Sequence, residues 1–175
     1  MFPLLGIEFK AADSGYEEIV DYNLSHRDLV VFLAFGKARS AAKKYPNAII
    51  VSADTMVSFR GKVIGKPKNK AEAAAMLKSF SGKSQDVITG VAVLDAQSKQ
   101  VVTAVDKFTV HFKKLSAKDI ADYIKKGNPY DKAGGYNLQG PGLNIIRKLE
   151  GDFSCALGLP MTIVFNALEQ LGLEV

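Results

Sequence analysis

Short apolar runs alternate along this chain with longer stretches of helical periodicity. Residues 49–51, Ile-Ile-Val, form a β-branched run that predicts a buried strand. Residues 107–112 alternate polar with apolar side chains, which is typical of a strand with one exposed face. Apolar residues also recur every three or four positions within residues 25–44, 73–80 and 116–127, which indicates amphipathic helices. The pattern therefore predicts an α/β fold.

Local signals indicate where several of these elements begin and end. Ser25, with Asp28 three residues later, matches a capping box, and Ser116 caps the third helix in the same way. Pro46 should stop the first helix near residue 44. Further strands are expected at residues 7–11, 86–94 and 101–112, and a last helix carries the apolar positions 164, 167, 168 and 171.

Polar residues follow the strand at 49–51 at its carboxyl end, where open α/β sheets usually place their ligands. Asp54 and Thr55 are these residues. A hairpin turning at Arg60-Gly61 is expected next, and it would bring Lys66 back beside Asp54. A carboxylate and an ammonium on two strand ends could form a site for a metal and a phosphate. The alternative is that both side chains merely solvate the strand ends.

Two other stretches combine residues that could bind a ligand. Residues 131–140 surround one tyrosine with glycines, which let the backbone approach a ligand, and with the polar Asp131, Lys132 and Gln139. A turn between strands could have the same composition. Glu18 follows Glu17, and two adjacent carboxylates usually lie in a solvated loop. The alternative is that one of them, Glu18, reaches a metal.

Composition favours a single globular domain. The 175 residues, 47% hydrophobic and 23% charged, are enough for one domain, residues 1–175, with a substantial core. The single cysteine, Cys155, excludes an intrachain disulfide and is expected to be a small buried hydrophobe. The first residues lack the basic flank of a signal peptide, and no apolar run reaches the ~18 residues of a membrane span. We therefore expect a cytoplasmic protein without a membrane partner.

The net charge of +5 does not by itself identify a partner. The lysines are scattered, and the chain has neither zinc-finger spacing nor a helix-turn-helix pattern, so nucleic-acid binding is not expected. A small polyanion such as a nucleoside triphosphate suits the same charge.

Several short motifs, in their order and spacing, resemble the Maf family of nucleoside triphosphate pyrophosphatases, formerly labelled septum-formation inhibitors. The likeness covers nearly the whole chain. It implies an elongated α/β fold with a mixed sheet and a cleft between two lobes, similar to inosine triphosphate pyrophosphatases. The motifs are Ala53-Asp54-Thr55, Gly65-Lys66-Pro67, Thr89-Gly90-Val91, residues 131–140, and Gly151 followed by Gly158-Leu159-Pro160.

The resemblance implies hydrolysis of a nucleoside triphosphate to the monophosphate and pyrophosphate, with a divalent cation, Mg²⁺ or Mn²⁺. The Asp-Thr pair and the Gln139-Gly140 ending are similar to the branch that acts on dTTP and UTP. The branch that favours 7-methyl-GTP has Cys in place of Lys132 and Glu in place of Gln139. Pyrimidine triphosphates, including modified ones, are thus the implied substrates. Nucleotide housecleaning and a part in septum formation both remain open, and a homodimer is reasonable for such a fold.

The resemblance also implies roles for individual residues. Asp54 would act as the base, or as a metal ligand that orients the attacking water. A carboxylate with a pKa of ~4 is a poor base at neutral pH unless burial raises that pKa, so orienting water is the more economical role. The other implied roles are phosphate neutralisation by Lys66 and Lys132, metal binding by Glu18, and reading of the base by Thr55 and Gln139.

The chain departs from the family pattern at two places. Family members begin with a strand and a Ser-x-Ser-Pro-Arg-Arg segment that grips the triphosphate, and the given sequence starts downstream of it. The expectation is either a truncated start or a non-catalytic, nucleotide-binding or regulatory member. The second departure is Gln85, where the family often has a His, and we expect this change to be tolerated.

Overall fold

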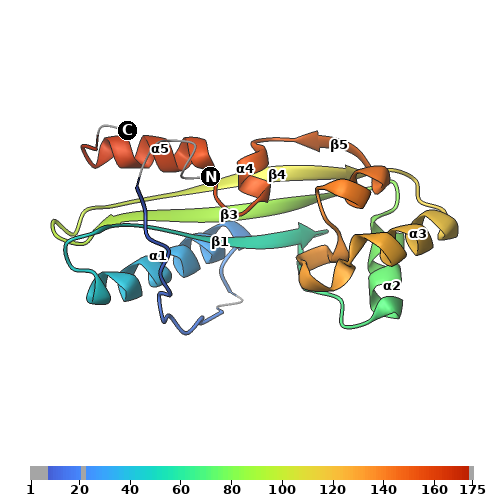
Figure 1. The fold of residues 1–175 in the computed structure, drawn as a ribbon, viewed down its shortest axis with the longest axis horizontal. Helices are drawn as coiled ribbons and strands as arrows, with labels where there is room; N and C mark the ends of the chain where they lie inside the picture. The colour runs from blue at the N-terminus through green and yellow to red at the C-terminus, as the bar shows by residue number, and fades with distance from the viewer. Residues whose placement is uncertain (1–7, 21–22, 174–175) are drawn as a thin grey trace. The chain divides into compact units, whose positions relative to one another are not determined.

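The computed structural model describes residues 8–20 and 23–173 of the chain (Figure 1). The five strands form one sheet in the order β2-β1-β3-β4-β5. Helices accompany the sheet, which confirms the α/β class. The elements are α1 (His26–Lys44), β1 (Ile49–Phe59), β2 (Lys62–Ile64), α2 (Lys70–Phe80), β3 (Ser84–Asp95), β4 (Val101–Phe112), α3 (Ala117–Gly127), the 3₁₀ turns η2 (Pro129–Asp131), η3 (Ala133–Gly135) and η4 (Gly140–Ile145), β5 (Ile146–Glu150), α4 (Phe153–Ala156) and α5 (Met161–Gln170).

The chain divides into two compact units, and the boundary passes through β1, β3 and β4. The first unit comprises Met1–Thr55, Ile88–Lys107 and Asp152–Val175, and the second comprises Met56–Val87 and Phe108–Gly151. The prediction of one domain over residues 1–175 stays a prediction.

Among the described helices, none has both the length and the apolar character needed to cross a membrane.

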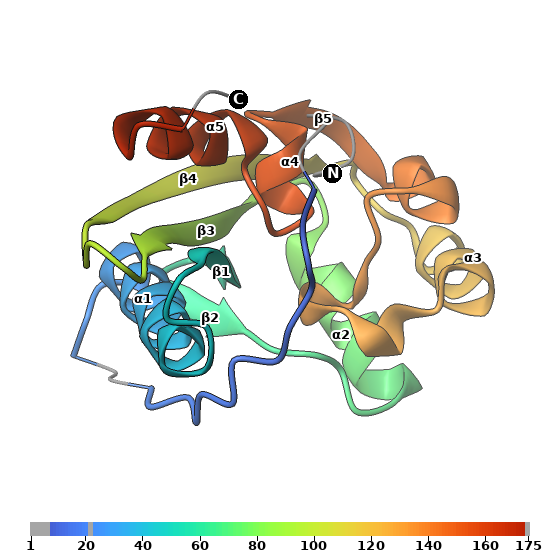
Figure 2. The same ribbon diagram turned by 60° about the vertical axis from the view of Figure 1, so that its left-hand side comes forward.

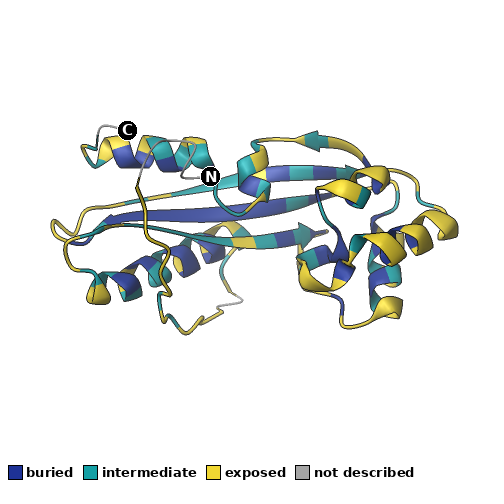
Figure 3. Cartoon of the chain, viewed as in Figure 1, coloured by how far each residue is buried: buried dark blue, intermediate teal, exposed yellow. Residues whose placement is uncertain are grey.

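In the first unit, successive residues of β3 face two different helices. Val91 and Val93 pack with α5, whereas Ala92 and Leu94 pack with α1. Figures 1 and 2 show α1 and α5 on opposite sides of this strand. A strand covered on both faces needs apolar residues at every position, so β3 is buried almost throughout (Figure 3).

In the second unit, a row of aromatic rings forms part of the core. Phe80 of α2 lies between Phe59 of β1 and Phe112 of β4, with ring centroids 5.0 and 5.4 Å away. Tyr136 continues the row from Phe112, edge to face, at 5.0 Å. Such ring pairs stabilise beyond their buried area by about 0.5–1.5 kcal/mol each. The row connects elements that are far apart in the sequence.

The hairpin expected after residue 55 is confirmed. Val57 pairs with Ile64 and Phe59 with Lys62, in antiparallel register. Arg60 and Gly61 both have positive φ, 52° and 74°, as a two-residue type I′ turn requires.

Two other expectations differ from the structure. The recorded strand pairs, β1–β2 and β4–β5, are antiparallel, whereas the resemblance implied a mixed sheet. Residues 8–11 form no strand, and Phe9 among them is 55% exposed; Ile7 lies outside the described residues. Alternating polarity predicts a strand only where a neighbouring strand can pair with it, and the sequence pattern does not reveal that neighbour.

Gly90 provides a test of the packing between β3 and α1. A Cβ at this position would lie 2.4 Å from the carbonyl carbon of Val30 and 2.5 Å from its oxygen. We expect Gly90→Ala to lower the free energy of unfolding by about 3 kcal/mol, because helix backbone cannot yield as a side chain would. Urea denaturation measures this loss. The matched control is Gly65→Ala, which has open space; equal losses in both variants would contradict the close approach.

Candidate functional site

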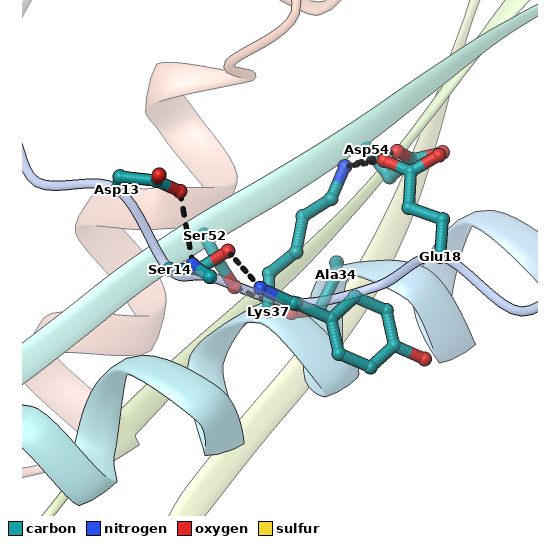
Figure 4. A network of polar contacts seen from close by, with 9 residues as sticks. Asp13, Ser14, Glu18, Ala34, Lys37, Ser52 and Asp54 are labelled. Atoms are coloured by element: carbon teal, nitrogen blue, oxygen red, sulfur yellow. Dashed lines mark hydrogen bonds and ion pairs between the residues drawn. The ribbon is translucent and has the colours of Figure 1, made fainter.

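Three charged side chains meet in the first unit (Figure 4). The Lys37 Nζ lies 2.6 Å from Asp54 Oδ1 and 2.7 Å from Glu18 Oε1. Lys37 comes from α1, Asp54 from β1, and Glu18 from the irregular segment before α1. One ammonium group therefore joins two carboxylates that are distant in the sequence.

The alternation of β1 explains why Asp54 points toward α1. Ile50 packs with the buried alanines of that helix, and the Ser52 hydroxyl donates to the Ala34 carbonyl at 2.6 Å. Asp54 is the next residue on the same face of the strand. On the helix, Lys37 follows Ala34 by three residues, which places both on one side of α1.

Glu18 is positioned by the way its segment packs on α1. The Tyr16 ring lies so close to Gly36 that a Cβ there would be 2.4 Å from Tyr16 Cζ. The Ser40 hydroxyl donates to the Ser14 carbonyl at 2.8 Å. These contacts fix the course of the chain just before Glu18. Any side chain larger than hydrogen at Gly36 would displace the tyrosine.

Burial and charge together set the protonation of this cluster. The Asp54 side chain is 10% exposed. Its burial raises the pKa of Asp54, the hydrogen bond and charge of Lys37 lower it in part, and the charge of Glu18 adds to the rise. Burial lowers the pKa of Lys37, but the hydrogen bonds and charges of Asp54 and Glu18 outweigh this and leave that pKa raised. Lys37 is therefore a cation at neutral pH, and Asp54 is more basic than an exposed aspartate.

Thr55 faces the opposite side of β1 from Asp54, as neighbouring strand residues must. Its Oγ1 lies 2.8 Å from the Oγ1 of buried Thr89, and Thr89 donates to the Cys155 carbonyl at 2.9 Å. A hydroxyl has only one proton, so Thr55 must donate to Thr89. Burial raises the pKa of the Cys155 thiol to about 11, and this cysteine is the buried hydrophobe that was expected.

In the second unit, two of the motifs found in the sequence contact each other. The Gly134 N–H donates to the Gly65 carbonyl at 2.9 Å. Lys66 follows Gly65 directly, and Lys132 lies two residues before Gly134, so both lysines flank this contact. Both are exposed, and Lys132 Nζ lies 3.3 Å from an oxygen of Asp131.

Gln139 lies at the end of the same loop. The hydroxyl of Tyr123 accepts from the Asn137 N–H at 2.9 Å, and the Asn137 side chain accepts from the Gln139 N–H at 3.2 Å. The Gln139 residue is exposed. The backbone of the loop is thus anchored at Asn137 and Gln139, while Gln139 remains exposed.

The profile of the Maf-like protein family matches residues 2–171 of this chain. The chain belongs to the Maf family. It is 38% identical over 172 residues to the dTTP/UTP pyrophosphatase of Methanosarcina mazei, covering 98% of this chain and 87% of that protein. The dTTP/UTP pyrophosphatases of Geobacillus sp. and Bacillus anthracis are each 36% identical, covering 98% and 100% of this chain and 91% of each relative. These three names are those of enzymes, and none favours the non-catalytic alternative.

The structure of this Maf chain brings some of the predicted site residues together. Asp54 and Glu18 meet on one lysine in the first unit, while Thr55 lies on the other face of β1. The proximity of Lys66 to Asp54 stays a prediction, because these residues belong to different units. Lys66, Lys132 and Gln139 all belong to the second unit.

Lys37 is the site residue that the sequence analysis missed. It lies between Ala34 and Ala38, within the buried stripe of α1. A charged residue inside an apolar helical stripe needs a buried or half-buried partner. That position was the available signal, but nothing in the sequence said which carboxylate would be its partner.

The carboxylates of Glu18 and Asp54 also fit a divalent cation. Each directs one oxygen to Lys37, so the second oxygen of each is the one that a cation would use. Mg²⁺ commonly binds one or two carboxylates and completes its shell with water and substrate phosphates. Within residues 8–20 and 23–173, no three His, Cys, Asp or Glu side chains gather in one place. A cation held by these two residues would therefore share its shell with the substrate.

Removing the charge of Lys37 tests the electrostatics of the cluster. We expect Lys37→Met to raise the pKa of Asp54 further, because burial and the charge of Glu18 remain while the neutralising ammonium is lost. An acid with a higher pKa in the folded than in the unfolded state loses stability as the pH rises through that folded pKa. The variant should therefore lose roughly 1–3 kcal/mol at neutral pH and less in mild acid.

Carbon-13 NMR titration of the Asp54 carboxyl measures the change in pKa, and urea unfolding at about pH 4 and about pH 8 measures the stability. Lys37→Arg keeps the charge and is the matched control, with a much smaller effect expected. An unchanged Asp54 titration in Lys37→Met would show that the ion pair does not set this pKa.

Proposed function

We propose that this Maf protein hydrolyses nucleoside triphosphates between the α and β phosphates, with dTTP and UTP as preferred substrates. The observation that carries the proposal is the half-buried cluster of Asp54, Lys37 and Glu18. The substrate class comes from the relatives, which are dTTP/UTP pyrophosphatases. The products would be the nucleoside monophosphate and pyrophosphate.

Asp54 would hold the attacking water against the α phosphorus. Its raised pKa makes its carboxylate a better proton acceptor than an ordinary aspartate, which supports the role of base beside the role of metal ligand. Lys37 fixes the direction of one Asp54 oxygen, so the other oxygen is presented in a defined orientation. Such preorganisation reduces the motion that is needed to reach the transition state.

The triphosphate itself requires positive charge around it. Lys66 and Lys132, both exposed, would neutralise phosphate oxygens. A bound Mg²⁺ or Mn²⁺, held by Asp54 and Glu18, would supply further charge neutralisation and a more acidic water. Lys37 keeps these two carboxylates together before such a cation binds.

Recognition of the base is assigned to Gln139 and Thr55. The Gln139 amide offers a donor and an acceptor side by side, which matches the edge of uracil or thymine. Thr55 donates its proton to Thr89, so toward a ligand its hydroxyl oxygen would be an acceptor. We extend the proposal to a cytoplasmic role in removing unwanted nucleotides, with a link to septum formation and a homodimeric assembly as further parts of it.

Pyrophosphate release from dTTP, UTP, CTP, GTP and ITP, with Mg²⁺ or Mn²⁺, tests the proposal. We expect dTTP and UTP to be hydrolysed fastest. Asp54→Asn should lower kcat by roughly 10²-fold or more, because the amide can neither accept the proton nor hold a cation as a carboxylate does.

The chain offers a matched control in two adjacent carboxylates. Glu18→Gln should lower activity, whereas Glu17→Gln should leave it unchanged, because Glu18 is the one of these two described glutamates that pairs with Lys37. Circular dichroism and thermal unfolding confirm that each variant is folded. A folded Asp54→Asn protein with full activity would remove Asp54 from the mechanism, and a folded parent protein that is inactive on all five nucleotides would refute the proposed activity.

A further inference from the structure

Gln85 of β3 is a buried amide whose polar atoms are not used in this structure. The residue is 2% exposed, and among the described residues neither its Nε2 nor its Oε1 has a hydrogen-bond partner. Nearly all buried polar groups in native proteins have partners, and leaving one unsatisfied is destabilising. A group kept at such a cost needs an explanation.

The amide lies beneath the loop of residues 131–140. A Cβ at Gly134 would be 3.5 Å from Gln85 Nε2 and 2.9 Å from the ring of Tyr136, so the loop backbone lies against both side chains. Burial raises the pKa of the Tyr136 phenol far above its ordinary value, and the side chain of Gln85, which approaches the phenol without reaching the geometry of a hydrogen bond, lowers it only in part. The phenol is therefore a neutral O–H donor next to an amide that offers an acceptor.

The same loop has a buried face and an exposed face. Gly134, Tyr136 and Leu138 are buried, whereas Lys132 and Gln139 are exposed. A shift of the loop that brings its exposed side chains onto a ligand must therefore also move its buried face relative to Gln85. The two faces are coupled because only a few residues separate them.

We propose that Gln85 is a positioning residue for nucleotide binding. When the loop closes on a nucleoside triphosphate, the Tyr136 hydroxyl donates to Gln85 Oε1, and Gln85 Nε2 donates to a carbonyl of the loop. The hydrogen bonds that are missing in the resting structure then form only in the bound state, which is how a ligand can favour one conformation over another. This inference rests on the proposed function, since it assigns Lys132 and Gln139 to the nucleotide.

The test uses Gln85→Met, which keeps the length of the side chain and removes the amide. Without nucleotide, the variant should unfold at the same or a higher temperature than the parent protein, because an unsatisfied buried group is gone. Its KM for dTTP should rise roughly 5- to 30-fold with kcat nearly unchanged, the expected loss for one or two hydrogen bonds made only in the bound state. Affinity for a non-hydrolysable dTTP analogue, measured by calorimetry, should fall by the same factor.

Two further variants make the test specific. Tyr136→Phe removes only the hydroxyl and should weaken nucleotide binding. The double variant with Gln85→Met should lose less binding free energy than the sum of the two single losses, because both substitutions remove the same hydrogen bond. Thr89→Val is the contrast for stability, because its buried hydroxyl has partners on both sides and its loss should destabilise the protein.

The combination of retained stability and weakened binding is what supports the inference. Lower stability of Gln85→Met without nucleotide would overturn it, because the amide would then already be satisfied in the resting protein. Unchanged nucleotide affinity of Gln85→Met, with normal binding by the parent protein, would also overturn it and leave the proposed function intact. Absence of dTTP and UTP binding by the parent protein would refute the proposed function and this inference together.

Discussion

Neighbouring residues of a strand face opposite sides, and this constraint determines how the candidate site is built. On β1, Ser52 and Asp54 face α1, whereas Thr55 faces Thr89 and the carbonyl of Cys155. Two residues that stand side by side in the sequence therefore belong to two separate polar networks. One is a charged cluster, and the other is a chain of hydroxyls.

The charged cluster depends on Lys37. Two carboxylates that approach each other in a half-buried place repel one another unless a cation lies between them. Lys37 fills this position, and the three groups together carry a net charge of about −1 at neutral pH. This excess favours a further cation, and such a cation would in turn attract phosphate oxygens. By itself, a cluster of this net charge repels a polyanion.

Much of the local structure followed from the sequence because its causes are local. Ser116 and Asp119 form the full capping box that their spacing indicates, and Arg60-Gly61 makes the expected turn. The partner of Lys37 could not be predicted, because it depends on which strand lies beside α1 and in which register. The strand expected at residues 7–11 was wrong for residues 8–11 for a similar reason, since a strand requires a neighbour that its own sequence does not specify.

The candidate site residues in the second unit could likewise be predicted only in part from the sequence. Gly134 and Gly135 have φ values of 78° and 69°, so the loop turns there in a way that residues with a side chain rarely adopt. These turns bury Tyr136 beside Gln85 and leave Lys132 and Gln139 at the surface. The motif could be recognised from its glycines, but the unsatisfied amide beneath it could not, because Gln85 lies about 50 residues earlier in the chain. A buried polar group without a hydrogen-bond partner, such as the Gln85 amide beside this loop, is typical of positions that are kept for function rather than for stability.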